Sequence, residues 1–357
     1  MQDDILPLIE AWPGNGVFVH HDQPTGTWIF IAIHSAALGM PLGGSRMKSY
    51  ASKRDAVTDA MRLAAGMTAK WAGLDMPFGG AKAVLMVSRP IEGTERRELF
   101  LRYGALIDSL AGAYATGADL GTGPADMATI AEKTKYVFGV DFETGEPTDP
   151  GPFTALGVFE GLRAAVEHVF DGASESKNAL DGRSVLIQGL GGVGAPLARR
   201  LHAHGATLLL SDLDETKAAA LAEELGGRAV LPDDALGTDC DVFAPCATGG
   251  ILNAESIPRL ACRVVAGSAN NQLGEDADAA RLDARGILYV PDYIINAGGA
   301  MALPLMAQGL SEQAALEARV AGLGETVRQT LDEAREAAIT PLEAAERRVT
   351  RRLAAAG

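Results

Sequence analysis

The first part of the chain alternates between strand-like and helical patterns of apolar residues. Two β-rich runs, Val17–His21 and Thr27–Ser35, flank Gln23-Pro-Thr-Gly26, and this predicts a hairpin because Pro and Gly supply the turn. The predicted elements that follow are a Gly-rich loop at Leu38–Arg46, a helix to Trp71 that opens with Ser52 and Asp55 as a capping box, a strand at Lys82–Ser88, a helix at Glu95–Ala111 and a helix from Pro124 to about Lys135.

From Gly182 onward, short apolar runs alternate with helical ones. Near-continuous apolar strands separated by helices are typical of a parallel sheet that is buried on both faces. The predicted strands are Ser184–Gln188, Thr207–Asp212, Asp241–Pro245, Val264–Gly267 and Ile287–Val290. From about Ser311, two amphipathic helices with Pro341 between them are expected to run to the end.

The length of 357 residues exceeds the usual size of one hydrophobic core, so two domains are expected. The segment Thr144–Pro152 is rich in Pro and Gly, which makes it the best candidate for a linker, and a helix at Thr154–Val169 leads out of it. The fold class is therefore predicted to be α/β with two domains. Residues 1–148 form an N-terminal α/β domain, and residues 149–357 form a Rossmann domain with C-terminal helices, the last of which is free to pack back on the first domain.

The composition limits the partners of the protein. Hydrophobic residues make up 47% of the chain and charged residues 22%, as in ordinary soluble proteins, and the net charge of −15 argues against binding to nucleic acid or to an anionic membrane. The N-terminus lacks the features of a signal peptide, and no apolar run reaches the roughly 18 residues of a membrane span, so a cytoplasmic location is expected. The three cysteines and six histidines match no zinc pattern, so no metal is expected.

A glycine-rich turn predicts a dinucleotide site. The sequence Gly189-Leu-Gly-Gly-Val-Gly194 follows an apolar strand and opens a helix, so that amides at the helix N-terminus face a pyrophosphate. An acid, Asp212, ends the next strand 18 residues after Gly194, and a carboxylate there accepts hydrogen bonds from a ribose diol and repels a 2′-phosphate. The predicted cofactor is NAD, and the structural alternative is a turn beside a solvated aspartate. The residues assigned to the cofactor here are Gly189, Gly191, Gly192, Val193, Gly194 and Asp212.

Two lysines stand where a folding pattern alone does not require them. Lys70 closes an apolar helix, and Lys82 opens an apolar strand directly after Gly79-Gly-Ala81. Glycines let the backbone come close to a ligand. Each lysine taken alone is explained by a side chain that extends to solvent at the end of an element. The pair together favours a substrate site.

Further glycine-containing loops follow the later strands, where ligands of such a sheet bind. They are Cys246–Gly250, Ser268–Gln272 and Asn296–Gly299. Asn270 or Asn271 could hold a carboxamide because Asn offers both a donor and an acceptor. The alternative for each is an asparagine that only forms a turn.

Over nearly its whole length the sequence resembles the family of glutamate, leucine, valine and phenylalanine dehydrogenases. The motifs that carry this resemblance are Gly43-Gly-Ser-Arg46, Gly66-Met-Thr-Ala-Lys70, Gly79-Gly-Ala-Lys82, Thr116-Gly-Ala-Asp-Leu-Gly121, the turn at Gly189, Gly267-Ser-Ala-Asn-Asn271 and Asn296-Ala-Gly-Gly299. The resemblance implies NAD-dependent oxidative deamination of an L-amino acid, and it is closer to the leucine and phenylalanine branch than to glutamate. Two departures, Ala83 and Leu120, remove no functional group.

The resemblance also implies roles for individual residues. Lys70, beside Met67, binds the substrate α-carboxylate with the backbone of Gly43 and Gly44. Lys82 activates the water that attacks the imine. Asp119 moves the protons of the amine and of water. Thr154, Ala247, Asn270 and Asn296 match positions that belong to the cofactor site.

Three apolar residues, Leu42, Ala300 and Leu303, are expected to contact the side chain of the substrate. Glutamate dehydrogenases carry a lysine at the position of Leu42, so an acidic side chain would lose its hydration here without a partner. The small Ala300 favours phenylalanine over leucine or valine, although one methylene discriminates by only about 1–3 kcal/mol.

Two other functions are compatible with the same fold. One is an NAD-dependent dehydrogenase of another small acid, such as a 2-hydroxy acid, although the histidines lie outside every Gly-rich motif. The other is a non-catalytic NAD-binding protein, which would not need both lysines and Asp119. The resemblance implies a homo-oligomer, a dimer or an octamer, and the strands of the N-terminal hairpin could pair between subunits.

Overall fold

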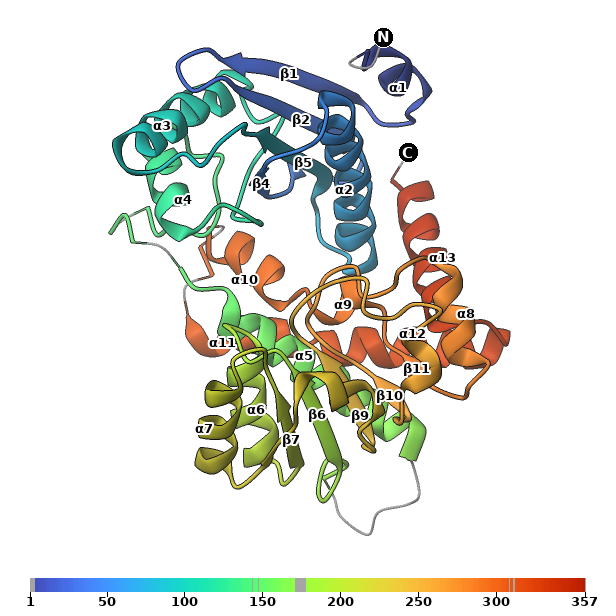
Figure 1. Cartoon of the computed structure of the whole chain (residues 1–357). Helices are drawn as coiled ribbons and strands as arrows, with labels where there is room; N and C mark the ends of the chain where they lie inside the picture. The colour runs from blue at the N-terminus through green and yellow to red at the C-terminus, as the bar shows by residue number, and fades with distance from the viewer. Residues whose placement is uncertain are drawn as a thin grey trace. The chain divides into compact units, whose positions relative to one another are not determined.

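The computed structural model describes residues 4–142, 144–146, 148–170, 178–307, 309–310 and 312–356. Its chain divides into two compact units, Met1–Asp149 with Arg348–Gly357, and Pro150–Arg347. Figure 1 labels the helices and strands of both units. Each unit is described by itself. The predicted linker and the start of the predicted C-terminal helices include Pro147 and Ser311, which lie outside the described residues.

Unit 1 is built on a mixed sheet with β5 at its centre. Strand β5 pairs antiparallel with β2 and parallel with β3 and β4, and β1 pairs antiparallel with β2, which confirms the predicted hairpin. The strands are β1 (Gly16–Asp22), β2 (Thr27–Ser35), β3 (Pro41–Leu42), β4 (Ser45–Lys48) and β5 (Gly79–Met86). The prediction of a loop at Leu38–Arg46 was wrong in part, because β3 and the start of β4 lie in it. Such short strands, interrupted by glycines, carry no alternating pattern.

The alternation of side chains along β2 divides unit 1 into two cores. Ile29 and Ile31 pack with α3 on one face of the sheet, whereas Phe30 and Ala32 pack with α2 on the other. Figure 1 shows α2 lying along the sheet, with α3 and α4 across its other face. The helices of this unit are α1 (Leu6–Ala11), α2 (Lys53–Gly73), α3 (Gly93–Ser109) and α4 (Pro124–Ala131).

Helix α2 begins where the sequence predicts. The Ser52 hydroxyl accepts a hydrogen bond from the Asp55 amide and donates one to the Asp55 carboxylate. At the other end, the Gly73 carbonyl oxygen accepts a hydrogen bond from Nε of Arg348, which also pairs with Asp75. The end of the chain therefore secures the end of the helix that carries Lys70.

Unit 2 contains the predicted parallel sheet, with the strand order β11-β10-β9-β6-β7-β8. Its strands are β6 (Ser184–Gln188), β7 (Thr207–Ser211), β8 (Arg228–Ala229), β9 (Val242–Pro245), β10 (Val264–Val265) and β11 (Leu288–Tyr289). The prediction missed β8, because two exposed residues at the edge carry no apolar signal. Buried apolar residues such as Leu186 and Phe243 from neighbouring strands form the core on the sheet.

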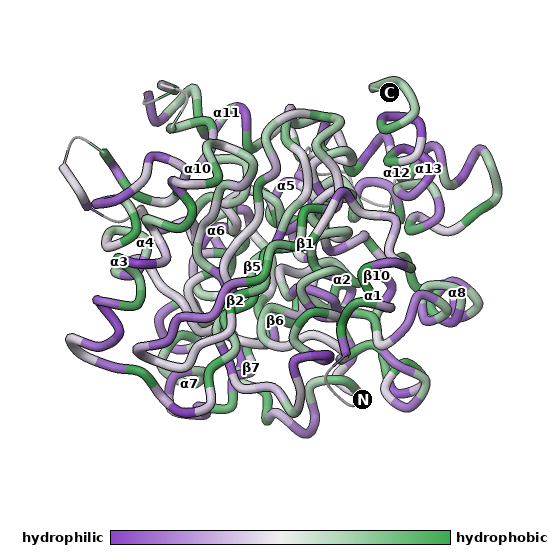
Figure 2. Tube along the Cα trace, turned by 90° about the horizontal axis from the view of Figure 1, so that it is seen from above, coloured by the Kyte–Doolittle hydropathy of each residue, from purple (hydrophilic) through white to green (hydrophobic). Residues whose placement is uncertain are grey.

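Helices cover the sheet of unit 2 and complete the chain. They are α5 (Gly151–Phe170), α6 (Gly194–Ala203), α7 (Glu215–Leu225), η1 (Pro232–Gly237), η2 (Ile257–Arg259), α8 (Ala277–Asp283), α9 (Asp292–Ile295), α10 (Gly298–Ala307), α11 (Gln313–Ala321) and α12 (Leu323–Ala337). The last helix, α13 (Pro341–Ala354), begins in unit 2 and ends in unit 1. Figure 2 shows hydrophilic residues along α7 and α8, which have solvent-exposed faces. The prediction of two C-terminal helices was wrong, because α11 ends before Gly322 and α12 begins after it. Among the described residues, no helix combines the length and apolarity needed to cross a membrane.

Candidate active site

Lys82 and Asp119 form a buried ion pair in unit 1. The Nζ atom of Lys82 lies 2.9 Å from Oδ2 of Asp119, and Lys82 is 6% exposed. Strand period places Lys82 on the same face of β5 as Val84, which packs against α2. Asp119 follows Ala118, which bridges to Ser45 at the start of β4. The structure thus brings together the two residues to which the resemblance assigns the proton chemistry.

A second cation contacts the same carboxylate oxygen. Nε of Arg46 lies 3.0 Å from Oδ2 of Asp119. Burial alone would raise the pKa of Asp119, but the charges of Lys82 and Arg46 and the hydrogen bonds it accepts lower the pKa to about 2. Asp119 is therefore ionised at neutral pH.

Gly43 and Gly44 lie where no larger residue fits. A Cβ atom on Gly43 would come 1.6 Å from the Ala81 carbonyl oxygen, and one on Gly44 would come 2.8 Å from the Ala118 carbonyl oxygen. The Gly43 amide donates to the Ala115 carbonyl, and the Gly44 carbonyl accepts from the Ala83 amide. These glycines bring the turn between β3 and β4 against both the strand of Lys82 and the loop of Asp119.

Lys70 and Met67 lie one turn apart on α2, so they share a face of that helix, and both are half-buried. Cγ of Met67 is 3.2 Å from the position that a Cβ on Gly43 would take. Leu42 is only 4% exposed, and its carbonyl accepts the indole N–H of Trp71. Met67 and Leu42 therefore lie at the turn at Gly43, and Lys70 lies one turn of α2 beyond Met67.

Sequence reasoning missed a cluster of buried hydroxyl groups beneath this turn. Oγ of Ser45 lies 2.7 Å from the Tyr103 hydroxyl and 2.6 Å from Oγ1 of Thr116, and the Tyr114 hydroxyl donates to the Gly43 carbonyl at 2.8 Å. Oγ1 of Thr122 donates to the Ser45 carbonyl and accepts the Asp119 amide. The available signal was the pair of hydroxyl side chains, Tyr114 and Thr116, directly before the loop of Asp119.

The glycine turn of unit 2 contains two kinds of glycine: those that packing requires and those whose surroundings are open. Gly189 has φ +95°, and a Cβ there would be 2.7 Å from Cβ of Ala247, while a Cβ on Gly194 would be 1.9 Å from the Gly189 carbonyl oxygen. Around Gly191 and Gly192 an added Cβ meets nothing within 4 Å. Packing within the described chain therefore does not require these two glycines, whereas close approach of a ligand to the backbone would require them. Val193 is the N-cap of α6 and makes no side-chain cap.

Asp212 holds the glycine turn from the end of β7. Its Oδ2 accepts the Leu190 amide at 2.7 Å, and Nζ of Lys217 lies 3.8 Å from it. Burial raises the pKa of Asp212, but hydrogen bonds from the Leu190 and Asp214 amides outweigh this effect and lower it. Two buried polar atoms at the adjoining strand ends, Oε1 of Gln188 and Oγ of Ser211, have no hydrogen-bond partner among the described residues. A polar ligand at this edge would fit both the orphaned atoms and the open glycines.

The later loops meet at the same edge, the carboxyl ends of the parallel strands. Nδ2 of Asn296 donates to Oδ1 of Asn270 at 2.8 Å, whereas Asn271 adopts φ +52° as a turn residue. The two asparagines therefore differ: the Asn270 side chain binds Asn296, and Asn271 forms the turn. Oγ1 of Thr154 accepts the Gly299 amide at 3.1 Å, which brings the first turn of α5 to the start of α10.

Ala300 and Leu303 lie one turn apart on α10. Both are half-buried, while Met301 and Ala302 between them are buried. The helix therefore presents a partly exposed apolar stripe that starts beside Gly299 and hence beside Thr154.

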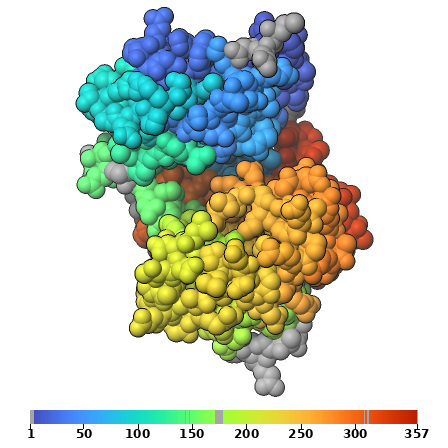
Figure 3. All heavy atoms as spheres, in the orientation of Figure 1, coloured from blue at the N-terminus to red at the C-terminus, as the bar shows by residue number. Residues whose placement is uncertain are grey.

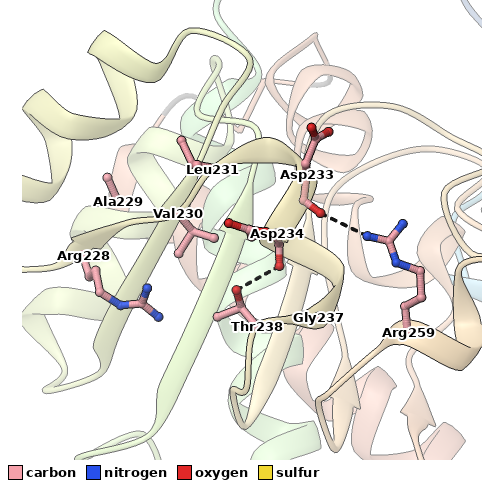
Figure 4. Close-up of a pocket in the computed structure, with 9 residues that line it drawn as sticks. All are labelled: Arg228, Ala229, Val230, Leu231, Asp233, Asp234, Gly237, Thr238 and Arg259. Carbon is pink, nitrogen blue, oxygen red and sulfur yellow. Dashed lines mark hydrogen bonds between the residues drawn. The ribbon is translucent and has the colours of Figure 1, made fainter.

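One hollow of unit 2 contains none of the predicted site residues. This cavity of about 510 Å³ lies between the segment 228–231, η1 and Arg259 (Figure 4). Figure 3 shows the yellow part of the chain, to which the segment 228–231 and η1 belong, at the surface of unit 2. Arg259 donates to the Asp233 carbonyl and Thr238 to the Asp234 carbonyl. Arginines and aspartates mix along its walls, so its charge favours no ligand class. No cluster of three or more potential metal ligands occurs among the described residues.

A parallel sheet with a glycine turn in one unit, and a buried lysine–aspartate pair in the other, define the class of a two-domain dehydrogenase. Family models identify which class this is. Residues 20–136 match the Glu/Leu/Phe/Val dehydrogenase dimerisation domain, and residues 210–356 match the Glutamate/Leucine/Phenylalanine/Valine dehydrogenase domain. The chain belongs to this family, as the sequence motifs predicted. It is an amino-acid dehydrogenase, an oxidoreductase that acts on the CH–NH2 group of its donor.

Named relatives are similar over most of their length. The chain is 41% identical to a leucine dehydrogenase of Geobacillus stearothermophilus over 296 residues, 83% of this chain and 79% of that protein. It is 38% identical to a phenylalanine dehydrogenase of Caldalkalibacillus thermarum over 93% of this chain and 89% of that protein. The crystal structure of L-tryptophan dehydrogenase from Nostoc punctiforme superposes with a TM-score of 0.82, at 36% identity over 98% of each chain.

Proposed function

We propose that the protein catalyses the reversible NAD-dependent oxidative deamination of an apolar L-amino acid. The amino acid, NAD⁺ and water give the 2-oxo acid, ammonium, NADH and a proton. The observation that carries this proposal is the 2.9 Å ion pair between Lys82 and Asp119 beside the glycine turn at Gly43. A scaffold that only binds a nucleotide gains nothing from a buried charge pair, because such pairs are costly to desolvate.

In this proposal, Lys70 binds the α-carboxylate of the substrate. The backbone contribution comes from the Gly44 amide, because the Gly43 amide already donates to Ala115. Lys82 activates the water that attacks the imine carbon and stabilises the tetrahedral intermediate that forms when the water oxygen bonds to that carbon. Asp119, ionised at neutral pH, exchanges protons with the amine and with water.

The cofactor site is proposed at the carboxyl edge of the unit 2 sheet. When bound there, NAD⁺ accepts the hydride from the α-carbon. The backbone of Gly191, Gly192 and Val193 would face the pyrophosphate, and Asp212 the adenosine ribose, which favours NAD over NADP. Ala247 and Thr154 would contact the nicotinamide ribose region, and the amide pair Asn270–Asn296 would hold the carboxamide or the adjoining ribose.

The substrate side chain is proposed to be apolar and large. Leu42, Ala300 and Leu303 carry no charge, so a γ-carboxylate would have no partner among them. Phenylalanine remains the favoured substrate because Ala300 is small, with leucine and valine next. The similarity to a tryptophan dehydrogenase adds tryptophan as an aromatic candidate to be tested.

The organisation of the whole protein follows from the same proposal. Residues 1–148 would bind the substrate and form the contacts of a homo-oligomer, a dimer or a larger assembly, and residues 149–357 would bind the cofactor. A cytoplasmic location suits a reaction that uses the cellular NAD pool.

The test is a substrate profile followed by NADH absorbance. Phenylalanine, tryptophan, leucine, valine, glutamate and lactate are each offered with NAD and with NADP. Reduction of NAD with an apolar L-amino acid, and not with lactate, supports the proposal. Turnover of lactate alone would favour a hydroxy-acid dehydrogenase, and silence with every substrate would favour a non-catalytic protein.

A further inference from the structure

Arg46 links the carboxylate of Asp119 to a second buried carboxylate. From β4, its Nε donates to Oδ2 of Asp119 at 3.0 Å and its Nη1 donates to Oδ2 of Asp59 at 3.2 Å. All three side chains are largely shielded, with 15% of Arg46, 15% of Asp59 and 18% of Asp119 exposed. Neither the proton chemistry nor substrate binding has so far given Arg46 a role.

Asp59 is itself fixed on α2. The Tyr50 hydroxyl donates to its Oδ2 at 2.7 Å, and Nη2 of Arg62 donates to its Oδ1 at 2.9 Å. Burial and the neighbouring Asp59 raise the pKa of Tyr50, so its hydroxyl remains a neutral donor. The guanidinium of Arg46 is therefore fixed by Asp59 through Nη1 while its Nε binds Asp119.

The charges around Asp119 explain why one cation is not enough. Lys82 faces it from β5 and Arg46 from β4, and Asp59, Tyr50 and the buried Tyr114 are further titratable groups near it. In the proposed reaction Lys82 loses and regains a proton. While Lys82 is neutral, a buried Asp119 without another cation would be an uncompensated charge, which is strongly unfavourable. A guanidinium stays charged at every pH of interest.

We propose that Arg46 is a positioning residue, the permanent counter-charge that keeps the Asp119 carboxylate ionised and oriented when Lys82 gives up its proton. Asp59 and Tyr50 hold Arg46 at the distance this role needs. The reaction part of this inference rests on the proposed function. The hold of Arg46 on Asp119 does not, because it is a property of unit 1 alone.

The experiment compares four variants in the full-length protein. Arg46→Gln removes the charge. Arg46→Lys keeps the charge but cannot donate to Asp119 and Asp59 from two separate nitrogens. Asp59→Asn keeps the cation at Asp119 but weakens the bond that fixes Arg46. Arg97→Gln is the matched control, because it removes an exposed guanidinium of unit 1 that pairs with Glu132, away from Asp59 and Asp119. Each is measured for kcat and KM against pH, with circular dichroism as a check of folding.

For Arg46→Gln we expect kcat to fall on the order of 10–100-fold with little change in KM, as for a misplaced catalytic group. The acid limb of its pH profile should move to higher pH, because a buried carboxylate that loses a cation binds protons more tightly. Arg46→Lys should restore part of the activity and most of the acid limb. Asp59→Asn should lower kcat without moving the acid limb upward, and Arg97→Gln should change kcat by less than about twofold.

A second readout does not depend on turnover. Carboxyl carbons of aspartate are observed by ¹³C NMR, and the Asp119 signal is identified by its loss in Asp119→Asn. In the wild type this signal should titrate below about pH 4, and in Arg46→Gln its titration should move to higher pH, while Lys82 still limits the shift. A wild type inactive on every amino acid would overturn the proposed function, while the NMR titration would still decide whether Arg46 controls Asp119. Wild-type kcat and pH profile in Arg46→Gln, or an Asp119 titration that does not move from its wild-type pH, would overturn the inference.

Discussion

The ammonium of Lys82 and the carboxylate of Asp119 meet at 2.9 Å within unit 1, one from the middle of β5 and the other from the loop after residue 118. The pair is therefore assembled by the fold of a single unit, whether or not a cofactor occupies the other. This gives the first prediction. Lys82→Ala should reduce kcat on the order of 10²–10⁴-fold, the usual contribution of a positioned proton donor or acceptor.

Binding of NAD should survive that substitution, because the glycine turn belongs to unit 2. Stopped-flow NADH formation measures the first effect, and calorimetric titration with NAD measures the second. Lys133→Ala, which removes an exposed lysine of unit 1, is the control and should behave as the wild type. Near-normal turnover by Lys82→Ala would refute the role assigned to Lys82.

The Asp119 ion pair should also make stability depend on pH. Its pKa is lowered from 3.8 to about 2 in the folded protein, so the folded state binds the proton less tightly than the unfolded state. The sign follows directly. The stabilisation is fully present above about pH 4 and is lost as the pH falls through about 2, and it amounts to about 2 kcal/mol. Asp119→Asn lacks this dependence.

Thermal unfolding from about pH 6 to about pH 3 measures the effect as a difference between two proteins. We expect the melting temperature of the wild type to approach that of Asp119→Asn as the pH falls. Other carboxylates titrate in both proteins and largely cancel from the comparison. A constant difference at every pH would show that Asp119 is not held by these cations.

The four glycines of the turn at Gly189 should fall into two groups. Gly191→Ala meets no atom within 4 Å, so it should leave the melting temperature unchanged while weakening NAD about tenfold by blocking close approach of the pyrophosphate. Gly194→Ala would bring a Cβ to 1.9 Å from the Gly189 carbonyl oxygen, so it should destabilise unit 2 by about 1–3 kcal/mol. Calorimetry and NAD titration separate the two effects.

The matched control for Gly191 is Gly16→Ala, since Gly16 has equally open surroundings in the other unit. It should alter neither the stability nor the affinity for NAD. If Gly191→Ala binds NAD as the wild type does, the pyrophosphate does not approach the backbone there.

Asp212 should decide between NAD and NADP. Asp212→Asn keeps an oxygen that can accept the Leu190 amide but loses the negative charge that would repel a 2′-phosphate. We expect the ratio of kcat/KM for NADP to that for NAD to rise by about tenfold or more. Asp214→Asn, two residues along, is the control. An unchanged ratio would mean that the selectivity for the cofactor lies elsewhere.

Much of the fold was readable because its signals are local. The hairpin of β1 and β2, the Ser52 cap and the strand β6 each depend on residues adjacent in the sequence. The β3 and β4 pairings were not readable, because they depend on β5 some forty residues away rather than on a pattern of their own. Strand β8 gave no signal because its two residues are exposed at the sheet edge and form no apolar pattern.

The candidate site divides along the same line. Residue type and motif were enough to select Lys82, Asp119 and the glycines, because their chemistry is unusual in apolar or Gly-rich surroundings. Arg46 belongs to the motif Gly43–Arg46, but the sequence indicated no role for it. Its hydrogen bond to Asp59 joins β4 to α2, and such a contact has no sequence signature. The hydroxyl groups beneath Gly43 were missed because Ser45, Tyr103 and Tyr114 are far apart in the sequence and meet only in the folded unit.

Those hydroxyl groups give the last prediction. The Tyr114 hydroxyl is the donor to the Gly43 carbonyl oxygen, in a place with no exposed surface. Tyr114→Phe preserves the ring but leaves that oxygen without this donor, which costs about 1–3 kcal/mol in a buried site. Because Gly43 carries the turn proposed to bind the carboxylate, KM for the amino acid should rise more than kcat falls. Calorimetry and initial rates are the measurements. Tyr136→Phe, which also keeps its ring but lies half-buried outside the hydroxyl cluster, is the control and should change neither quantity. If Tyr114→Phe matches the wild type in both melting temperature and KM, the hydroxyl cluster does not position the turn at Gly43.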